Sequence, residues 1–392
     1  MATHEVTCAL IRGGTTKGVF IDGADLPGDS ARRDQLLLAL FGSPDTRQIN
    51  GLGGGDPLSS KVAIVRRTAD DDVDMEYLSG EVGIDENTIN YTTLCGNLAA
   101  GAALYALEAG WVPRTDPVAT VRLRNSNTGK RLTASIPLKA GACAMRLCKL
   151  IDGTAGYGTE MSLAFHDPAG AITGHLLPSG RTTDTFTLAS HGEIRGSVVD
   201  CGTLYGFVPA EALGLRGDER PLELDADAGF KSAVESIREQ IAFAVSANLG
   251  EAYCPQQVKV AIIGSVGVTA DTMVKSVTSR VINRYKTHKA YPVSGAICLS
   301  AAGVIPGTVV HELLGQTDAP STLHIVHPTG TMAVSTSFEI AHGQCKITQS
   351  VVNRSARVLM QGVAYAYVED EMMDYRRLSG DERIISPASM QS

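Results

Sequence analysis

Residues 90–110 have the sequence NYTTLCGNLAAGAALYALEAG, and this stretch decides the fold. From Gly96 onward it consists mainly of alanine, leucine and glycine, which predicts a helix that is buried on every side. Cys95 lies immediately before this helix and not on its apolar surface. The first backbone N–H groups of a helix have no partner within it, and the helix dipole is positive there. This position therefore favours a thiolate and can bind a carboxylate.

A second run of small residues, at 294–303, has the sequence SGAICLSAAG and predicts another buried helix. When the two runs are aligned, Ser294 and Gly295 stand where Cys95 and Gly96 stand in the first. The order of strand, turn and helix around the two runs is also similar. We interpret this similarity as an internal repeat.

The rest of the chain predicts strands and amphipathic helices around these two runs. Residues 5–21 contain two β-prone stretches around a Gly-Gly-Thr-Thr turn, which predicts a hairpin. Residues 31–43 and 230–250 have helical periodicity. We expect an α+β fold of two similar halves, residues 1–188 and 189–392, with both buried helices pointing their N-termini at a shared cleft. Whether the final strands return to the first half is left open.

Composition and charge exclude several classes of protein. The chain has 392 residues, of which 44% are hydrophobic, and a formal net charge of −8, which argues against non-specific binding to nucleic acid or to an anionic membrane. Its 8 cysteines form no CxxC pair and its 9 histidines no HExxH spacing, so we expect neither a disulfide framework nor a metal site. No signal peptide or membrane-spanning run is visible. We expect a cytoplasmic protein.

Lys61 lies between a glycine-rich loop, residues 51–60, and the apolar strand that begins with KVAIV. A lysine at such a junction can be desolvated, which makes it a candidate general base, although a solvated lysine is the competing interpretation. Neither this loop nor GGTTKG at residues 13–18 has the GxxxxGK[ST] or GxGxxG pattern of nucleotide sites. Both loops suit backbone binding of a carboxylate.

His288, Lys289 and His327 lie near loops of the second half. His288 and His327 are interpreted as candidates for either catalysis or structural hydrogen bonding. Arg354 and Arg357, in the segment RSAR, are interpreted as a salt-bridge pair near the end of a strand.

Six stretches taken together resemble the PrpF family. In chain order they are IRGGTTKGVF, GLGGGDPLSSKVAIV, CGNLAAGAALYALEAGWV, HKAYPVSGAICLSAA with IPGTVVHE, HPTGTM and RSARVLMQG, and they extend from residue 11 to about residue 362. The resemblance implies the fold of diaminopimelate epimerase, in which each of two α+β domains wraps a mixed sheet around a central helix. It also implies cofactor-independent isomerisation of unsaturated di- and tricarboxylates such as 2-methylaconitate, methylitaconate, aconitate or 4-oxalomesaconate.

The resemblance assigns the catalytic lysine to Lys61 and the catalytic cysteine to Cys95. Substrate binding is assigned to residues of the surrounding motifs: Thr15, Thr16, Lys17, Gly54, Gly55, Asp56, Ser60, Gly96, Asn97, His288, Ser294, Gly295 and Ala296. Leu94 stands where the family has asparagine, which concerns the choice of substrate more than the type of reaction. Thr16 and Thr329 replace serines of the family pattern and keep their hydroxyl groups.

The expected reaction is a 1,3-allylic proton shift on a small polycarboxylate, with no cofactor. A C–H bond next to a conjugated carboxylate is acidic because the carbanion delocalises as a dienolate, and donors aimed at the carboxylates stabilise that charge. Lys61 is the preferred acid and base. Cys95 either shares the proton transfer or donates a hydrogen bond that orients the substrate. The oligomeric state is left open.

Two alternatives compete with this reaction. An amino-acid racemase or epimerase of the same fold would use two opposed cysteines, but the second position holds Ser294 and the next thiol, Cys298, lies one helical turn further. A serine hydroxyl is a far weaker base than a thiolate, which disfavours this reading. A non-catalytic accessory protein would leave Lys61 and Cys95 without a role.

Overall fold

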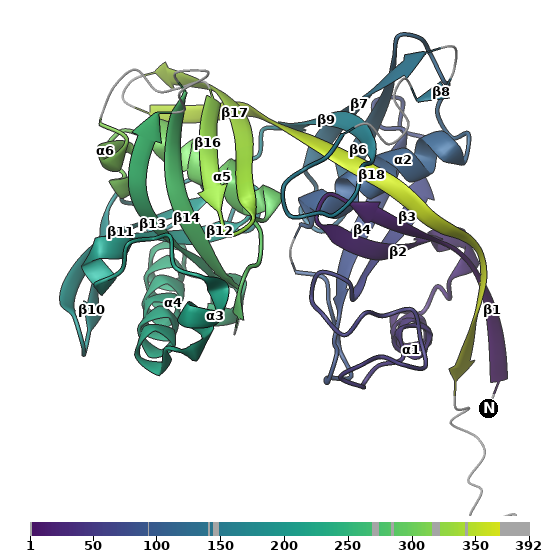
Figure 1. Ribbon diagram of the computed structural model, residues 1–392, viewed down its shortest axis with the longest axis horizontal. Helices are drawn as coiled ribbons and strands as arrows, with labels where there is room; N and C mark the ends of the chain where they lie inside the picture. The colour runs from purple at the N-terminus through teal and green to yellow at the C-terminus, as the bar shows by residue number, and fades with distance from the viewer. Residues whose placement is uncertain are drawn as a thin grey trace, which may run out of the picture.

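The computed structural model describes residues 2–92, 94–139, 142–143, 149–268, 274–283, 286–315, 322–341 and 344–368. Residues 369–392 of the predicted second half lie outside these ranges. Figure 1 shows two groups of elements, the earlier part of the chain on the right and the later part on the left, joined by one long strand. Within the described residues, no helix has the length and apolar character needed to cross a membrane.

The first group comprises β1 (Ala2–Gly13), β2 (Thr16–Asp22), η1 (Gly23–Asp25), α1 (Ser30–Phe41), β3 (Lys61–Arg67), β4 (Met75–Val82), β5 (Ile89–Asn90), α2 (Gly96–Glu108), β6 (Val118–Asn125), β7 (Arg131–Lys139), β8 (Ala142–Cys143) and β9 (Thr159–His166). The second group comprises β10 (Asp184–Leu188), β11 (Gly192–Asp200), β12 (Leu204–Pro209), η2 (Ala210–Leu213), α3 (Pro221–Ala226), α4 (Ala228–Leu249), η3 (Pro255–Gln257), β13 (Lys259–Val268), β14 (Lys275–Asn283), β15 (Lys286–Thr287), α5 (Val293–Val304), α6 (Val309–Leu313), β16 (Thr322–His327) and β17 (Gly330–Ala341). The last strand, β18 (Gln344–Val368), contacts both groups.

Helix α2 is surrounded by strands because its side chains are small and apolar. It begins at Gly96, and Cys95 precedes it with φ −107° and ψ 97°, an extended backbone. A Cβ at Gly101 would lie 2.3 Å from Cζ of Phe20, so a glycine is needed where β2 packs on the helix. Every residue of α5 is buried in the same way. The two predicted central helices are confirmed.

Strand β1 approaches α2 equally closely at Gly13, and this contact gives a stability prediction. A Cβ at Gly13 would lie 2.1 Å from the backbone oxygen of Asn97, an atom fixed within the helix. We expect Gly13→Ala to lower the free energy of unfolding by about 3 kcal/mol, measured by urea denaturation. Gly28→Ala is the control, because its methyl group would meet nothing within 4 Å. Equal stability of the two variants would contradict the close packing.

The strand order is the same around the two central helices. In the first group β2 pairs in parallel with β3, β3 pairs antiparallel with β4, and β4 pairs antiparallel with β5 and in parallel with β6. In the second group β12, β13, β14, β15 and β16 repeat these pairings in the same order. Helix α2 packs on β1, β2, β3, β4 and β6, while α5 packs on β11, β12, β16 and β17. The predicted α+β class and internal repeat are confirmed.

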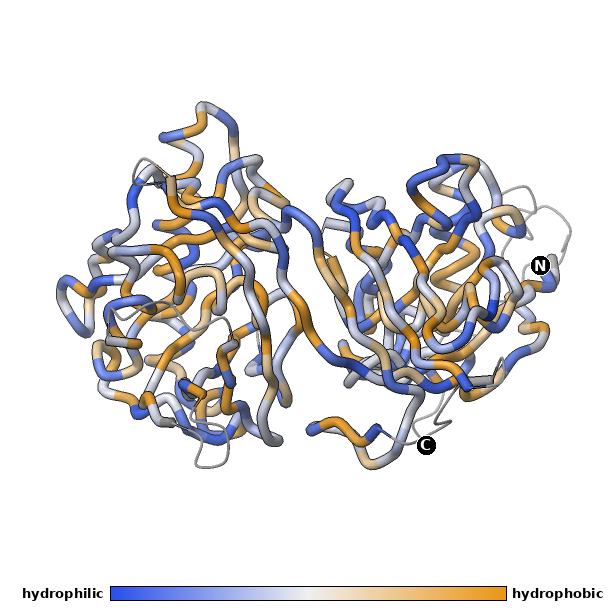
Figure 2. The backbone as a smooth tube through the Cα atoms, turned by 90° about the horizontal axis from the view of Figure 1, so that it is seen from above, coloured by the Kyte–Doolittle hydropathy of each residue, from blue (hydrophilic) through white to orange (hydrophobic). Residues whose placement is uncertain are grey.

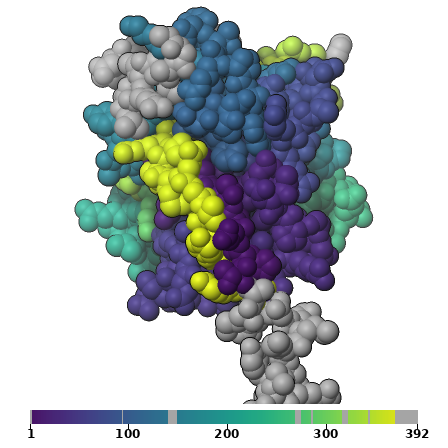
Figure 3. Space-filling model, turned by 90° about the vertical axis from the view of Figure 1, so that its right-hand side faces the viewer, coloured from purple at the N-terminus to yellow at the C-terminus, as the bar shows by residue number. Residues whose placement is uncertain are grey.

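Strand β18 connects the two groups. It pairs antiparallel with β17 and β9 and then with β1. Val352, for example, is the partner of Val334 in β17 and of Leu163 in β9. Figure 3 shows β18, in yellow, lying beside β1, in purple, on the surface of the first group. The last described strand therefore returns to the first group of elements. The boundary between the two halves at residue 188 stays a prediction.

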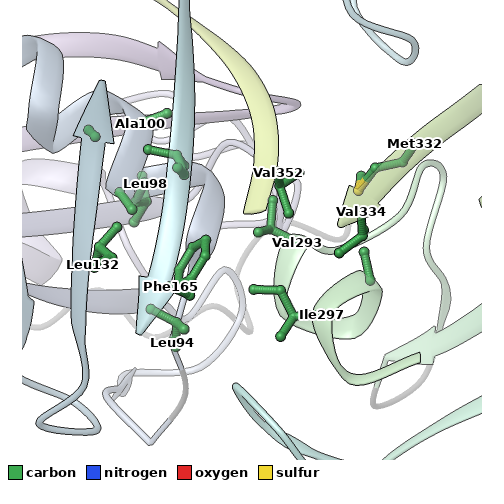
Figure 4. Close-up of a cluster of buried hydrophobic side chains, with 14 of the residues drawn as sticks. Leu94, Leu98, Ala100, Leu132, Phe165, Val293, Ile297, Met332, Val334 and Val352 are labelled. Carbon is green, nitrogen blue, oxygen red and sulfur yellow. The ribbon is translucent and has the colours of Figure 1, made fainter. Parts of the chain in front are cut away.

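The hydrophobic core continues through the junction between the groups. The largest cluster of buried apolar side chains contains residues of both central helices, and smaller clusters lie around α4 and α1. Figure 4 shows Leu94 and Phe165 of the first group next to Val293 and Ile297 of α5. Figure 2 shows the apolar segments, in orange, concentrated inside each group. Packing at this junction therefore holds the starts of the two helices in place.

Candidate active site

The N-termini of α2 and α5 meet at the junction of the two groups. A Cβ at Gly96 would lie 2.6 Å from Cγ1 of Val293, so the first turn of each helix contacts the other. The unpaired N–H groups and positive dipole ends of two helices thus converge in one place. Such a place favours negative charge on a ligand.

Lys61 is held beside the start of α2 by its strand pairing. It lies opposite Glu81 in the register of β3 and β4, and its Nζ is 3.0 Å from Oε2 of Glu81. The Lys61 side chain is only 12% exposed. Burial acts to lower the pKa of Lys61, but the carboxylate of Glu81 and, after it, the electrostatic interaction with Cys95 outweigh burial and raise that pKa above its ordinary value. Lys61 is therefore a charged ammonium group at neutral pH.

The Cys95 side chain is not used to cap its own helix. Its backbone N–H donates a hydrogen bond to Oγ of Ser79 at 3.3 Å, and its side chain makes no capping hydrogen bond to α2. The residue is half-buried, and it interacts electrostatically with Lys61. The structure thus brings together the two residues that the sequence assigns to catalysis.

The ion pair predicts how the titration of Lys61 responds to its neighbour. An adjacent carboxylate favours the ammonium form, so Glu81→Gln should lower the pKa of Lys61, because the largest interaction that opposes the effect of burial is then removed. We expect this shift in a pH titration of the lysine side-chain signals by NMR. Glu76→Gln is the control on the same strand, since Glu76 pairs with Arg124 at 3.0 Å instead. An unchanged titration of Lys61 in Glu81→Gln would contradict the coupling.

The turn between β1 and β2 is fastened to the start of α2 by Asn97. Its Nδ2 donates to Oγ1 of Thr15 at 3.1 Å and of Thr16 at 3.3 Å. Thr16 and Asn97 are buried, whereas Thr15 is half-buried. A Cβ at Gly153, in the loop before β9, would lie 3.0 Å both from Cγ2 of Thr15 and from Oγ1 of Thr329. Thr15 thus lies where segments of both groups meet.

The glycine loop reaches the second group through Asp56. Its Oδ2 lies 2.8 Å from Nζ of Lys289, in the segment before α5. Burial acts to raise the pKa of Asp56, but the hydrogen bonds from Lys289 and from the backbone N–H of Leu58 outweigh it and lower that pKa. Asp56 is therefore an anion that ties the loop across the junction.

Other predicted residues of this loop are committed to its own structure. The backbone N–H of Gly55 donates to Oε1 of Gln48 at 2.9 Å. The buried hydroxyl of Ser60 accepts a hydrogen bond from Gln48 at 2.7 Å and donates one to the backbone oxygen of Val82 at 2.9 Å. Gly54 is exposed, with Nζ of Lys17 at 3.4 Å from a Cβ built there. Substrate contacts of these residues stay predictions.

The predicted residues of the second group also differ in whether they interact with the lysines or are buried within the fold. His288 accepts a hydrogen bond at Nδ1 from the backbone N–H of Ala290 at 3.1 Å, so Nε2 carries the proton. Burial lowers the pKa of His288 to about 4, and the charges of Lys259 and Lys61 act in the same direction. His288 is therefore a neutral donor that interacts with both lysines. Ser294, Gly295 and Ala296, in contrast, are buried within the fold.

Lys259 is a site residue that the sequence argument missed. It is half-buried at the start of β13 and interacts electrostatically with Glu81, Lys61 and Cys95. The signal was present, because residues 259–263 read KVAII and repeat the KVAIV that begins at Lys61. Aligning the strands as well as the helices of the two halves would have found it.

The salt-bridge interpretation of Arg354 and Arg357 is wrong. Neither has a carboxylate partner within the described part of the chain. Arg354 is 5% exposed, and its Nε has no hydrogen-bond partner among the described residues. Burial lowers the pKa of Arg354 to about 10, so the group stays charged at neutral pH. It interacts with His327, which in turn interacts with His288.

The second cysteine of a two-cysteine mechanism is missing from this place. Cys298 is fully buried in α5, and its Sγ donates to the backbone oxygen of Val199 at 3.3 Å. Burial raises the pKa of Cys298 well above its ordinary value. A neutral buried thiol cannot act as a base opposite Cys95. Within the described ranges, no group of three or more His, Cys, Asp or Glu side chains is arranged to hold a metal ion.

Known isomerases resemble this chain over nearly its whole length. The chain is 33% identical to the 3-methylitaconate isomerase of Eubacterium barkeri, over 93% of this chain and 97% of that protein. It is 35% identical to the 4-oxalomesaconate tautomerase of Pseudomonas putida, over 93% of this chain and 96% of that protein. The crystal structure of a methylitaconate-delta-isomerase superposes with a TM-score of 0.73 at 30% identity, over 98% of this chain and 100% of that chain.

More distant structures bear on the fold alone. A hydroxyproline epimerase from Agrobacterium vitis superposes with a TM-score of 0.56 at 14% identity, over 94% of each chain. The expected fold of the diaminopimelate epimerase type is thereby confirmed. The model of the PrpF protein family matches residues 3–367. With the repeated sheets, the two central helices and the lysine and cysteine at their junction, the chain belongs to the PrpF family.

Proposed function

We propose that this protein is an isomerase that catalyses a 1,3-allylic proton shift in an unsaturated di- or tricarboxylate. The observation that carries the proposal is Lys61 beside Cys95 at the start of α2, with Lys259 interacting electrostatically with both and Arg354 linked to the lysines through His327 and His288. Such a group of cations suits a substrate with more than one negative charge. The relatives named for 3-methylitaconate and 4-oxalomesaconate are named for compounds of this kind. The proposal includes a cytoplasmic location, where Cys95 stays reduced.

The reacting end of the substrate lies, in this proposal, at the start of α2. Removal of an allylic proton leaves a carbanion whose charge spreads into the conjugated carboxylate. The N–H groups at the start of α2 and the ammonium group of Lys61 stabilise this charge, and the Cys95 thiol donates to the same carboxylate. These groups are fixed before the reaction by the Glu81 ion pair and the helix, so little reorganisation is needed when the charge develops.

The remote carboxylate pairs, in this proposal, with Arg354. A buried guanidinium group without a carboxylate partner is costly to the folded protein, and a carboxylate ligand would supply that partner. The imidazoles of His288 and His327 are held neutral. His327 interacts electrostatically with Arg354, and His288 interacts with His327 and with the two lysines. Neutral histidines can donate hydrogen bonds without repelling the neighbouring cations.

Arg354→Met should therefore raise KM roughly tenfold or more, because the substrate loses a hydrogen-bonded charge pair. The effect on kcat should be smaller. Its free energy of unfolding should stay equal or increase, because an unpaired buried charge is removed. The matched control is Arg280→Met, whose guanidinium group is also buried but donates to the backbone oxygens of Asp218 and Glu219. That variant should be destabilised. A destabilised Arg354→Met with unchanged KM would give Arg354 a structural role.

The experiment that tests the function follows proton exchange and double-bond migration in D₂O by proton NMR. The substrates are cis- and trans-aconitate, 2-methylaconitate, 3-methylitaconate and 4-oxalomesaconate. Vinylacetate is the control, because it has the allylic C–H bond but only one carboxylate. We expect deuterium incorporation and migration with at least one polycarboxylate and none with vinylacetate. Exchange at Cα of proline with no reaction of any polycarboxylate would instead indicate an epimerase.

A further inference from the structure

Strand β4 changes its pairing partner at Ser79. Its pairing with β6 ends at Tyr77, which lies opposite Asn125. Its pairing with β5 begins at Glu81, which lies opposite Asn90. Ser79 stands between these two pairings and is only 3% exposed. A buried backbone N–H or C=O group without a partner is costly, so another part of the chain has to supply the hydrogen bonds of Ser79 on this side of β4.

The side chain of Asn127, in the turn between β6 and β7, supplies these hydrogen bonds. Its Oδ1 accepts one from the backbone N–H of Ser79 at 2.9 Å, and its Nδ2 donates one to the backbone oxygen of Ser79 at 2.8 Å. Nδ2 also donates to the backbone oxygen of Tyr91 at 2.7 Å. Asn125 donates to Oδ1 at 2.8 Å, which fixes the direction in which the amide faces. One amide group thus takes the place of a neighbouring strand.

The same amide is connected to Cys95 through the hydroxyl group of Ser79. Oγ of Ser79 donates to Oδ1 of Asn127 at 2.9 Å and accepts a hydrogen bond from the backbone N–H of Cys95 at 3.3 Å. The Cys95 side chain makes no capping hydrogen bond to α2, so the place of its thiol depends on how its backbone is held. The chain that leads into α2 is therefore held by Asn127 directly at Tyr91 and through Ser79 at Cys95.

Strand β4 also carries the residue that holds Lys61. Ser79 and Glu81 are two residues apart on one strand, so their side chains lie on the same face of the sheet. Glu81 holds Lys61 at 3.0 Å, and Ser79 holds the backbone of Cys95. A displacement of Ser79 would therefore change the position of Cys95 relative to Lys61.

We propose that Asn127 is a positioning residue of the isomerase, which fixes Cys95 relative to Lys61 by completing the hydrogen bonding of β4 at Ser79. The proposal rests on the proposed function, in which Cys95 contacts the substrate. The effect of Asn127 on the reaction passes through Cys95, so it should disappear when the thiol is absent. A residue that only stabilises the fold would affect the rate equally with and without the thiol.

A double-mutant cycle separates these two roles. Asn127→Ala should lower kcat/KM by roughly 10- to 10²-fold, because a displacement of about 1 Å at a group that contacts the substrate has an effect of this size. In the Cys95→Ala background, the same substitution should lower kcat/KM by less than about threefold. The measurement is the rate of double-bond migration for the wild type, both single variants and the double variant, with the polycarboxylate that the wild type converts.

Ser79→Ala tests the same connection with a smaller change. It removes the hydroxyl group between Asn127 and Cys95 but keeps the backbone of Ser79 paired with Asn127. We expect kcat/KM to fall roughly three- to tenfold, the effect of one hydrogen bond, and again only while Cys95 is present. Thermal unfolding checks that each variant is folded, and Ser79→Ala decides the test if Asn127→Ala does not fold.

Gln240→Ala is the matched control for the loss of an amide that pairs with a strand. In the second group, Oε1 of Gln240 accepts from the backbone N–H of Thr187 and Nε2 donates to its backbone oxygen, both at 2.9 Å. The hydrogen bonds have the same pattern as those of Asn127, but they hold α4 to β10. We expect Gln240→Ala to convert the substrate at the wild-type rate.

Hydrogen–deuterium exchange tests the contact without substrate. The peptide that contains Cys95 should exchange faster in Asn127→Ala and Ser79→Ala than in the wild type, while peptides of α4 stay unchanged. Unchanged exchange at Cys95, or equal losses of kcat/KM with and without the thiol, would overturn the proposal. Failure of the wild type to convert any polycarboxylate would instead count against the proposed function. The two failures are therefore distinguishable.

Discussion

Lys61→Met should abolish double-bond migration, with kcat/KM lowered by roughly 10³-fold or more. The variant loses the ammonium group that forms an ion pair with Glu81 beside the start of α2, and with it both an acid and a stabiliser of the dienolate. Methionine has nearly the length of lysine, so the core around β3 should stay intact. The measurement is the steady-state rate of migration, supported by thermal unfolding to show that the variant is folded.

The control for Lys61→Met is Lys149→Met. Lys149 also pairs with a carboxylate, Glu160 at 3.2 Å, but its side chain is 41% exposed and it lies outside the group of residues around Cys95. Its removal should change the rate by less than about twofold, because exposed ion pairs contribute little. A Lys61→Met enzyme within tenfold of the wild-type rate would remove Lys61 from the mechanism.

Cys95→Ala should lower kcat/KM by roughly 10²-fold, the cost of one donor at a developing negative charge. Cys95→Ser should keep most of the activity if the side chain only donates a hydrogen bond, because a hydroxyl donates as well as a thiol. We expect this result if Lys61 is both the acid and the base of the proposed shift. The measurement is kcat/KM for both variants with the same polycarboxylate.

Stability gives an internal control for the cysteine variants. Serine is a favoured residue at the N-cap and alanine is not, so Cys95→Ser should unfold at a higher urea concentration than Cys95→Ala. The two effects are independent: one concerns the helix start and the other the substrate. A Cys95→Ser enzyme as inactive as Cys95→Ala would show that the thiol itself carries a proton.

The sequence by itself determined the elements whose formation depends on neighbouring residues. The small apolar residues after Cys95 predict a buried helix, and α2 begins at Gly96. The leucine-rich run with its glycine stop predicts α1, which ends with Gly42 in the left-handed conformation at φ +74°. Hydrophobic periodicity and helix caps are local properties, and they can be recognised within one stretch of chain.

Only the tertiary structure decided which charges lie together. From the sequence alone, Lys259 is a lysine at the start of a strand. The fold brings it close enough to Lys61 and Cys95 to interact with them electrostatically. The segment RSAR predicts a salt-bridge pair of Arg354 and Arg357, but β18 places Arg354 opposite Met161 of β9, and no described carboxylate pairs with it. Ser60, in turn, has its hydroxyl bonded within the protein. Burial and charge pairing depend on segments distant in sequence, so no local pattern reports them.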